Sequence, residues 1–137
     1  MRVVFDTNVV LSGAGWRNES YACLVLAARR KAHPFATADT LDELKRIATR
    51  MHAEGAFRHD PWPILNWFFR SVRRVEPLPL GKRRSRDVSD DPYLACALSA
   101  KAAFVVTRDS DLLDLQKPFG IEMLTPRAFL SRIATAV

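Results

Sequence analysis

The chain has 137 residues, of which 48% are hydrophobic and 26% charged, and its formal net charge is +6. This length predicts a single domain, residues 1–137, with a sizeable core. The longest apolar segment, residues 21–28, is too short to cross a bilayer and no signal-peptide pattern is present, so we expect a cytoplasmic protein without membrane contact. The basic surface attracts polyanions such as nucleic acids, although a basic run is more often a solvated face.

The predicted elements begin with residues 3–5, a short apolar run typical of a strand buried on both faces of a parallel sheet. Thr40 and Glu43 have the spacing of a capping box, which predicts a helix from Thr40 to about residue 51. Asp60-Pro61 and Asp91-Pro92 are cap-then-proline pairs and predict two further helix starts. The other expected elements are a helix over 19–30 capped by Asn18, a strand at 35–36, at most an edge strand over 75–80, a basic loop over 81–90, a strand at 104–106, a short helix around 112–115, a strand at 121–124 and a terminal helix capped by Thr125.

Strands alternate with helices along most of the chain, which predicts an α/β fold. We expect a three-layer α/β/α sandwich with a central, mostly parallel, twisted sheet. The two cysteines, Cys23 and Cys96, lie in helical apolar patterns and are explained as packed thiols in a reduced compartment.

In a parallel sheet the carboxyl ends of the strands and the starts of the following helices share one edge, where ligands bind. Side chains far apart in the sequence therefore meet at that edge.

Four acidic side chains are predicted to lie at this edge. Asp6 follows the first strand, and Glu43 lies in the predicted first turn of the helix after the second strand. Asp91 starts a helix, and Asp109 follows the strand at 104–106. Each of the last three has a simpler explanation on its own, Glu43 in a capping box, Asp91 as a helix cap and Asp109 as a loop or capping carboxylate. Asp6 has none, because a carboxylate at the end of a buried strand is costly without a partner.

The joint occurrence of these four acids favours a binding site over four separate structural roles. Converging carboxylates raise each other's pKa values unless a counter-charge is present. The natural counter-charge is a hard divalent cation with oxygen ligands, so Mg²⁺ or Mn²⁺ is the expected cofactor. A calcium loop at Asp109 is excluded because its sixth position, Asp114, is not glycine. The sequence also has no glycine-rich phosphate loop and no histidines with metal-site spacing.

Four segments together resemble the PIN-domain nucleases, in particular the toxins of bacterial toxin–antitoxin pairs: FDTNVVLSG, LDEL around Glu43, DDPYLACALSAKAAFVVTRDSDLL and GIEMLTPRAFL. The resemblance implies a metal-dependent ribonuclease that cuts single-stranded RNA. It also implies an antitoxin protein as partner, and a second copy of the chain is a further candidate. The aromatic residues Trp62, Trp67 and Phe68 form the surface expected to receive an antitoxin segment.

The resemblance places metal-binding, catalytic carboxylates at four positions, Asp6, Glu43, Asp91 and Asp109. Asp111 is expected as an auxiliary metal ligand, and Asp90 competes with Asp91 for the third position. Site-organising roles are assigned to three polar neighbours, Thr7, Asn8 and Thr107. Because an acidic cleft repels RNA, we expect basic residues around it to hold the RNA backbone: Lys82, Arg83, Arg84, Arg86 and Arg108.

The expected reaction is two-metal phosphodiester hydrolysis, in which Asp6, Asp91 and Asp109 hold one cation. Glu43 helps to bind a second cation or orients the attacking water. Because the nucleophile is water, the products carry a 5′-phosphate and a 3′-hydroxyl. Two alternatives stay open, a PIN-like module that binds RNA or protein without cutting and a phosphoryl-transfer domain of the phosphatase or receiver type. The second is disfavoured because a haloacid-type phosphatase has an Asp where Asn8 stands.

Overall fold

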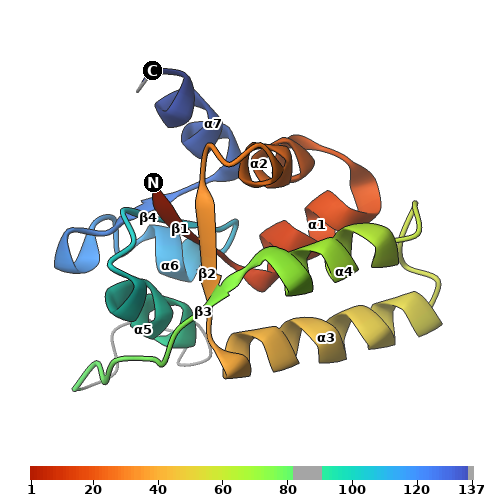
Figure 1. The fold of residues 1–137 in the computed structure, drawn as a ribbon, viewed down its shortest axis with the longest axis horizontal. Helices are drawn as coiled ribbons and strands as arrows, with labels where there is room; N and C mark the ends of the chain where they lie inside the picture. The colour runs from red at the N-terminus through yellow and green to blue at the C-terminus, as the bar shows by residue number, and fades with distance from the viewer. Residues whose placement is uncertain (82–90, 136–137) are drawn as a thin grey trace.

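The structure is a computed structural model and describes residues 1–81 and 91–135. Its centre is a sheet whose strand pairs are all parallel, in the order β3-β2-β1-β4-β5 (Figure 1). The strands are β1 (Arg2–Phe5), β2 (His33–Ala36), β3 (Arg73–Arg74), β4 (Phe104–Val106) and β5 (Glu122–Leu124). The strand order reverses between β1 and β4, so this pair forms the switch point at which open α/β sheets bind ligands.

Helices cover both faces of the sheet, as predicted for an α/β/α sandwich (Figure 1). One core cluster contains side chains from α1 (Thr7–Trp16), α2 (Glu19–Ala28), α3 (Ala38–Ala53), α4 (Trp62–Ser71) and α7 (Pro126–Thr135). The opposite cluster contains side chains from α5 (Asp91–Ala100) and α6 (Ser110–Leu113), and a short 3₁₀ turn, η2 (Pro118–Gly120), precedes β5. No described helix has the length and apolar character needed to span a membrane.

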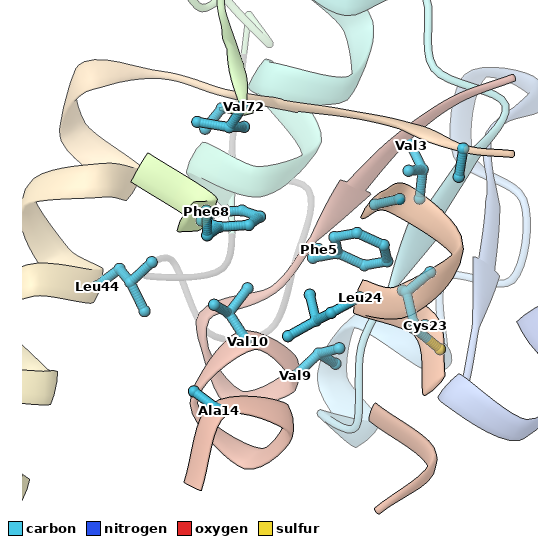
Figure 2. Packing of buried hydrophobic residues seen from close by; sticks show 14 of the residues in the cluster. Val3, Phe5, Val9, Val10, Ala14, Cys23, Leu24, Leu44, Phe68 and Val72 are labelled. Carbon is cyan, nitrogen blue, oxygen red and sulfur yellow. The ribbon is translucent and has the colours of Figure 1, made fainter. Parts of the chain in front are cut away.

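The strand β1 is buried on both faces because its side chains alternate between the two core clusters. Val3 and Phe5 lie in the cluster with α1 and α2, whereas Val4 lies in the cluster with α5. Figure 2 shows Phe5 pointing into the first cluster together with Leu24 from α2. Burial of such apolar side chains stabilises the fold by about 1.5–3 kcal/mol each. The end of β1, where Asp6 follows, is therefore held firmly.

The sequence pattern does not predict α1. This helix is buried on nearly all sides, so its side chains lack the amphipathic period that indicates a helix. Gly13 allows α1 to approach α2 closely, since a Cβ at this position would lie 2.8 Å from the Cδ1 atom of Leu24 and 3.0 Å from the backbone of Ser20. The helix begins directly after Asp6 and thus extends from the carboxyl edge of the sheet.

The predicted start of α3 at Thr40 is wrong. The helix begins at Ala38, and Thr37 is its N-cap. The Thr37 hydroxyl oxygen accepts a hydrogen bond from the Thr40 backbone N–H at 3.2 Å, and the Thr40 hydroxyl oxygen accepts one from the Thr37 N–H at 3.0 Å. Both threonines have a suitable partner three residues on, and the end of β2 at Ala36 selects Thr37. Glu43 therefore lies in the second turn of α3 rather than the first, and it takes no part in the cap.

Several other predicted local features are confirmed. Asn18 and Thr125 cap their helices through side-chain oxygens that accept backbone N–H groups at 3.0 and 3.1 Å. By contrast, the predicted helix start with Asp60 as cap and Pro61 as first helical residue is wrong, because α4 begins at Trp62 with Pro61 as its N-cap. Asp60 accepts the Trp62 N–H at 3.1 Å from outside the helix. Cys23 and Cys96 are free and buried, and burial raises the pKa of both thiols to about 12, as expected for packed, unreactive side chains.

The edge strand beside β2 is shorter than the sequence allows and lies before the predicted range 75–80. The edge strand β3 comprises Arg73–Arg74, and residues 75–80 are not in a strand. Pro77 and Pro79 lack the N–H groups that a longer strand would donate to its neighbour. Of the predicted basic loop, Gly81 is described and residues 82–90 lie outside the described part of the chain.

Candidate functional site

The candidate site is centred on Asp6, which follows β1 and is 4% exposed. Its backbone N–H donates to the Val106 carbonyl of β4 at 2.9 Å, and its Oδ2 accepts a hydrogen bond from Thr107 Oγ1 at 2.8 Å. Burial raises the pKa of Asp6 to about 6, although the hydrogen bond from Thr107 acts in the opposite direction. The negative charges of Asp109 and Glu43 add to the rise. These two carboxylates therefore interact with Asp6 across the carboxyl edge of the sheet.

The turn after β4 links Asp109 to Asp6 through Thr107. The hydroxyl of the fully buried Thr107 donates to Asp6 and accepts a hydrogen bond from the Asp109 N–H at 3.0 Å. One carboxylate oxygen of Asp109 accepts a hydrogen bond from the Asp111 N–H at 2.8 Å and caps α6. The capping role considered for Asp109 is thus confirmed. It leaves the second carboxylate oxygen for a ligand, so the two roles are compatible.

A second chain of hydrogen bonds reaches Glu43. The Tyr93 hydroxyl donates to Glu43 Oε2 at 2.7 Å and is also hydrogen-bonded to the Thr7 hydroxyl. Because Tyr93 has one hydroxyl proton and donates it to Glu43, Thr7 is the donor in the other bond. Burial raises the pKa of Tyr93, so this proton stays on the phenol at physiological pH. The side chains of Thr7, Tyr93 and Glu43 thereby connect α1, α5 and α3 at one edge.

Tyr93 is missing from the site that the sequence predicts. It is 3% exposed and lies two residues after Asp91 in α5. Its signal in the sequence is a single tyrosine in a helix of mostly small residues, DPYLACALSA, where packing is the simplest role. Its partner Glu43 is 50 residues away along the chain, so the link depends on the tertiary fold.

The remaining predicted site residues lie in different surroundings. Asp91 is buried in the first turn of α5 and lines a cavity of about 570 Å³ together with Thr37 and Asp39. Its place among the metal ligands stays a prediction. The alternative, Asp90, lies outside the described residues. Asn8 is exposed in the first turn of α1 and takes no part in the hydrogen bonds around Asp6 that are described above.

Of the basic residues predicted to bind RNA, Arg108 belongs to the described part of the chain. The other four lie outside it: Lys82, Arg83, Arg84 and Arg86. Arg108 is exposed, and its guanidinium donates to the Ser12 hydroxyl oxygen at 3.1 Å. This contact directs the Arg108 side chain toward α1. In the sequence, Arg108 immediately precedes Asp109.

The aromatic surface predicted around Trp62, Trp67 and Phe68 needs a correction. Phe68 is 3% exposed and belongs to the core, because it points from α4 toward the sheet side of the helix (Figure 2). Trp67 is half-buried and lines a cavity of about 230 Å³ between α2 and α4. The Trp62 indole N–H donates to Nδ1 of His52 at 2.8 Å. The two tryptophans therefore remain as the accessible part of this surface.

The donor chemistry of the site fits a hard divalent cation, but the described side chains form no closed coordination group. In residues 1–81 and 91–135, no three His, Cys, Asp or Glu side chains lie close enough to hold a metal ion together. Mg²⁺ usually keeps several waters and binds through one or two carboxylates plus substrate phosphates. Asp6 and Asp109 can supply such a pair. The raised pKa of Asp6 is typical of a buried carboxylate that lacks a nearby counter-charge.

Comparison with known proteins gives two findings. A family model described as PIN domain matches residues 2–111. Among solved structures, the chain is similar to the crystal structure of PAE2754 from Pyrobaculum aerophilum, with a TM-score of 0.66 and 20% sequence identity over 98% of this chain and 90% of that chain. At this identity the likeness shows the fold alone. No match is found among curated proteins.

Proposed function

Because the chain belongs to the PIN domain family, whose members are generally nucleases, we propose that it is a Mg²⁺- or Mn²⁺-dependent endoribonuclease that hydrolyses single-stranded RNA. The observation that carries this proposal is the buried Asp6, whose pKa is raised by burial and by the charges of Asp109 and Glu43. PIN domains usually use divalent metal ions. A purely structural role does not require three interacting acids at the switch point of the sheet.

The acids have two kinds of role in the proposed reaction. Asp6 and Asp109 would hold the cation, with Asp91 as the third carboxylate of the predicted set. When bound, such a cation activates water and neutralises the charge that develops on the phosphoryl oxygens. Glu43, held by the Tyr93 hydroxyl, orients the attacking water. Because water is the nucleophile, the products carry a 5′-phosphate and a 3′-hydroxyl.

The charge of the chain supports a polyanionic substrate. The formal net charge is +6 although the site itself is acidic, so the positive charge must lie elsewhere on the surface. The basic residues proposed to hold the RNA backbone are those predicted from the sequence: Lys82, Arg83, Arg84, Arg86 and Arg108. RNA binding should weaken as the salt concentration rises, because each phosphate contact releases counterions.

The finer role that we propose is that of the toxin in a bacterial toxin–antitoxin pair, acting on RNA in the cytoplasm. It is supported by the resemblance of the segments around Asp6, Glu43 and Asp109 to such toxins. The proposed partner is an antitoxin protein, and a second copy of the chain is a further candidate. Trp62 and Trp67 are the accessible aromatic residues proposed for this contact.

The cleavage proposal can be tested with a labelled pool of single-stranded RNA. The protein is expected to shorten the RNA with Mg²⁺ or Mn²⁺ and to leave it intact with EDTA. Glu43→Gln should slow cleavage by about 100-fold, because it removes the charge that orients the water while keeping the side-chain shape. The matched control is Asp42→Asn, which removes an exposed acid next to Glu43 on α3 and should leave the rate unchanged.

Two results would contradict the proposal. RNA of unchanged length with either cation would favour a PIN-like module that binds RNA or protein without cutting it. Products with a 2′,3′-cyclic phosphate would show that the ribose hydroxyl, and not water, attacks the phosphorus.

Tyr93→Phe is expected to lower kcat by about tenfold with little change in KM, because it removes the hydroxyl that positions Glu43. It also leaves the buried Thr7 hydroxyl without its acceptor, so the melting temperature should fall. The matched control is Tyr21→Phe in α2, where the ring can keep its contact with Arg17 at 5.5 Å. If Tyr93→Phe lowers the melting temperature but leaves kcat unchanged, Tyr93 has a structural role alone.

A further inference from the structure

We propose that the groove along α1 is a nucleobase-binding subsite, in which a base of the single-stranded RNA stacks on Trp16 close to the point of cleavage. The inference rests on the proposed ribonuclease function and specifies how its substrate is held. The groove has a volume of about 720 Å³ and is lined by residues of α1 together with Asn18, Met51 and Arg108. The groove is thus lined by residues other than the four proposed catalytic carboxylates, Asp6, Glu43, Asp91 and Asp109.

The groove follows one face of α1 and begins near the carboxyl edge of the sheet, where Asp6 lies. Asn8, Leu11, Ser12 and Trp16 line it, and their spacing places them on the same side of the helix. Asn8 lies two residues after Asp6, and Trp16 lies about 12 Å farther along the helix axis. A strand of RNA whose phosphate is at Asp6 can therefore continue along this face.

Trp16 is held in place by its neighbours and still exposed. Its side chain is 38% exposed at the end of α1. The ring of Phe57 lies against it with a centroid distance of 5.4 Å and an angle of 47° between the ring planes. Phe57 fits there because residue 15 is glycine, since a Cβ at Gly15 would lie 2.2 Å from the Phe57 ring. An aromatic ring supported in this way loses little side-chain entropy when a base stacks on it.

The polar residues of the groove suit the backbone of the RNA. Ser12 Oγ accepts hydrogen bonds from Arg108 at 3.1 Å and from Asn18 Nδ2 at 2.7 Å, which holds Arg108 over α1. Among the described residues, Arg108 donates to Ser12 and forms no ion pair. Trp16 and Arg108 line the same groove, and an aromatic ring together with a cation is a combination that binds single-stranded nucleic acids. Continuity with the acidic edge favours RNA over a protein segment as the occupant.

The proposal is tested by RNA binding in EDTA, where cleavage is excluded. Fluorescence anisotropy with a labelled single-stranded RNA should show a Kd raised by about tenfold or more for Trp16→Ala and by less for Trp16→Phe, because phenylalanine keeps a ring for stacking. The matched control is Phe119→Ala, which removes a ring that is 52% exposed in η2, the turn before the edge strand β5, and that does not line the groove. Its affinity should equal that of the wild type. Binding of duplex RNA should not change in any variant, because paired bases remain stacked on each other.

A second measurement uses the fluorescence of Trp16 itself. The chain has three tryptophans, so the double variant Trp62→Phe, Trp67→Phe leaves Trp16 as the single emitter. Single-stranded RNA should quench its emission, whereas inorganic phosphate should not, since phosphate has no ring to stack. Unchanged RNA affinity in a folded Trp16→Ala variant overturns the proposal and favours a protein partner as the occupant. Absence of quenching by bound RNA also overturns it.

The outcome is separable from that of the ribonuclease proposal. If the wild type cuts no RNA but binds it tightly in a manner that depends on Trp16, the subsite stands and the proposed reaction is wrong. If the wild type cuts RNA with Mg²⁺ and Trp16→Ala binds and cuts equally well, the reaction stands and the subsite is wrong.

Discussion

Asp6→Asn is expected to reduce Mg²⁺-dependent RNA cleavage by about 1,000-fold or more, because it removes a charged ligand oxygen at the centre of the proposed site. Asparagine has nearly the same shape, and its side-chain oxygen can still accept the hydrogen bond from Thr107. The fold should therefore be retained. Gel analysis of a labelled single-stranded RNA, with rates measured at saturating Mg²⁺, provides the comparison with the wild type.

A matched control removes an acid of the same type outside the site. Asp114 is exposed at the end of α6, and Asp114→Asn should cut RNA at the wild-type rate. Cleavage that survives in Asp6→Asn, in a preparation free of contaminating ribonuclease, would contradict the catalytic role of Asp6. In a bacterial host, expression of the wild type should halt growth and expression of Asp6→Asn should not. Normal growth with an active wild-type enzyme would contradict the toxin role but not the nuclease activity.

The free energy of unfolding of the metal-free wild type is expected to fall, relative to that of Asp6→Asn, as the pH rises from about 4 to about 6. The pKa of Asp6 is about 6 in the folded state against a usual value of 3.8, mainly because of burial. Between these two values the folded state binds more protons than the unfolded state, so the free energy of unfolding decreases with pH. This decrease in the free energy of unfolding, which is the penalty for burying the charged carboxylate, is complete above pH 6 and corresponds to about 3 kcal/mol. Below pH 4 the penalty vanishes.

Urea unfolding in EDTA at several pH values measures this difference. The free energy of unfolding of Asp6→Asn should exceed that of the wild type at pH 7 and approach it at pH 4. Adding Mg²⁺ at pH 7 should raise the stability of the wild type by mass action, by about 2.7 kcal/mol at 100 times the Kd, and should have little effect on Asp6→Asn. Parallel pH profiles of the two proteins would show that Asp6 carries no such penalty.

The positions of Asp6 and Asp109 could be predicted because they depend on a general property of parallel sheets. Each follows a short strand that ends in three apolar residues, and the carboxyl ends of parallel strands share an edge. The sequence therefore predicts that the two acids and Glu43 come near each other, and the influence of their charges on Asp6 agrees with this expectation. Their function as metal ligands, and that of Asp91, stays a prediction.

Other features could not be predicted because local patterns were ambiguous or silent. Thr37 and Thr40 both have the chemistry of an N-cap, and the exact end of β2 decides between them. The helix α1 has no amphipathic period because neighbouring helices and the sheet cover most of its sides. The contact between Tyr93 and Glu43 depends on how α5 packs beside α3, which no short segment of sequence specifies.

The two edges of the sheet influence how copies of the chain can associate. One edge is β3, two exposed arginines long, and at the other edge Glu122 of β5 forms an ion pair with Arg132 of α7 at 2.6 Å. Such short, charged edges offer few backbone groups to an incoming strand, so they protect against aggregation by continued strand addition. These edges therefore favour self-association through helical faces over growth of the sheet of one molecule into the next.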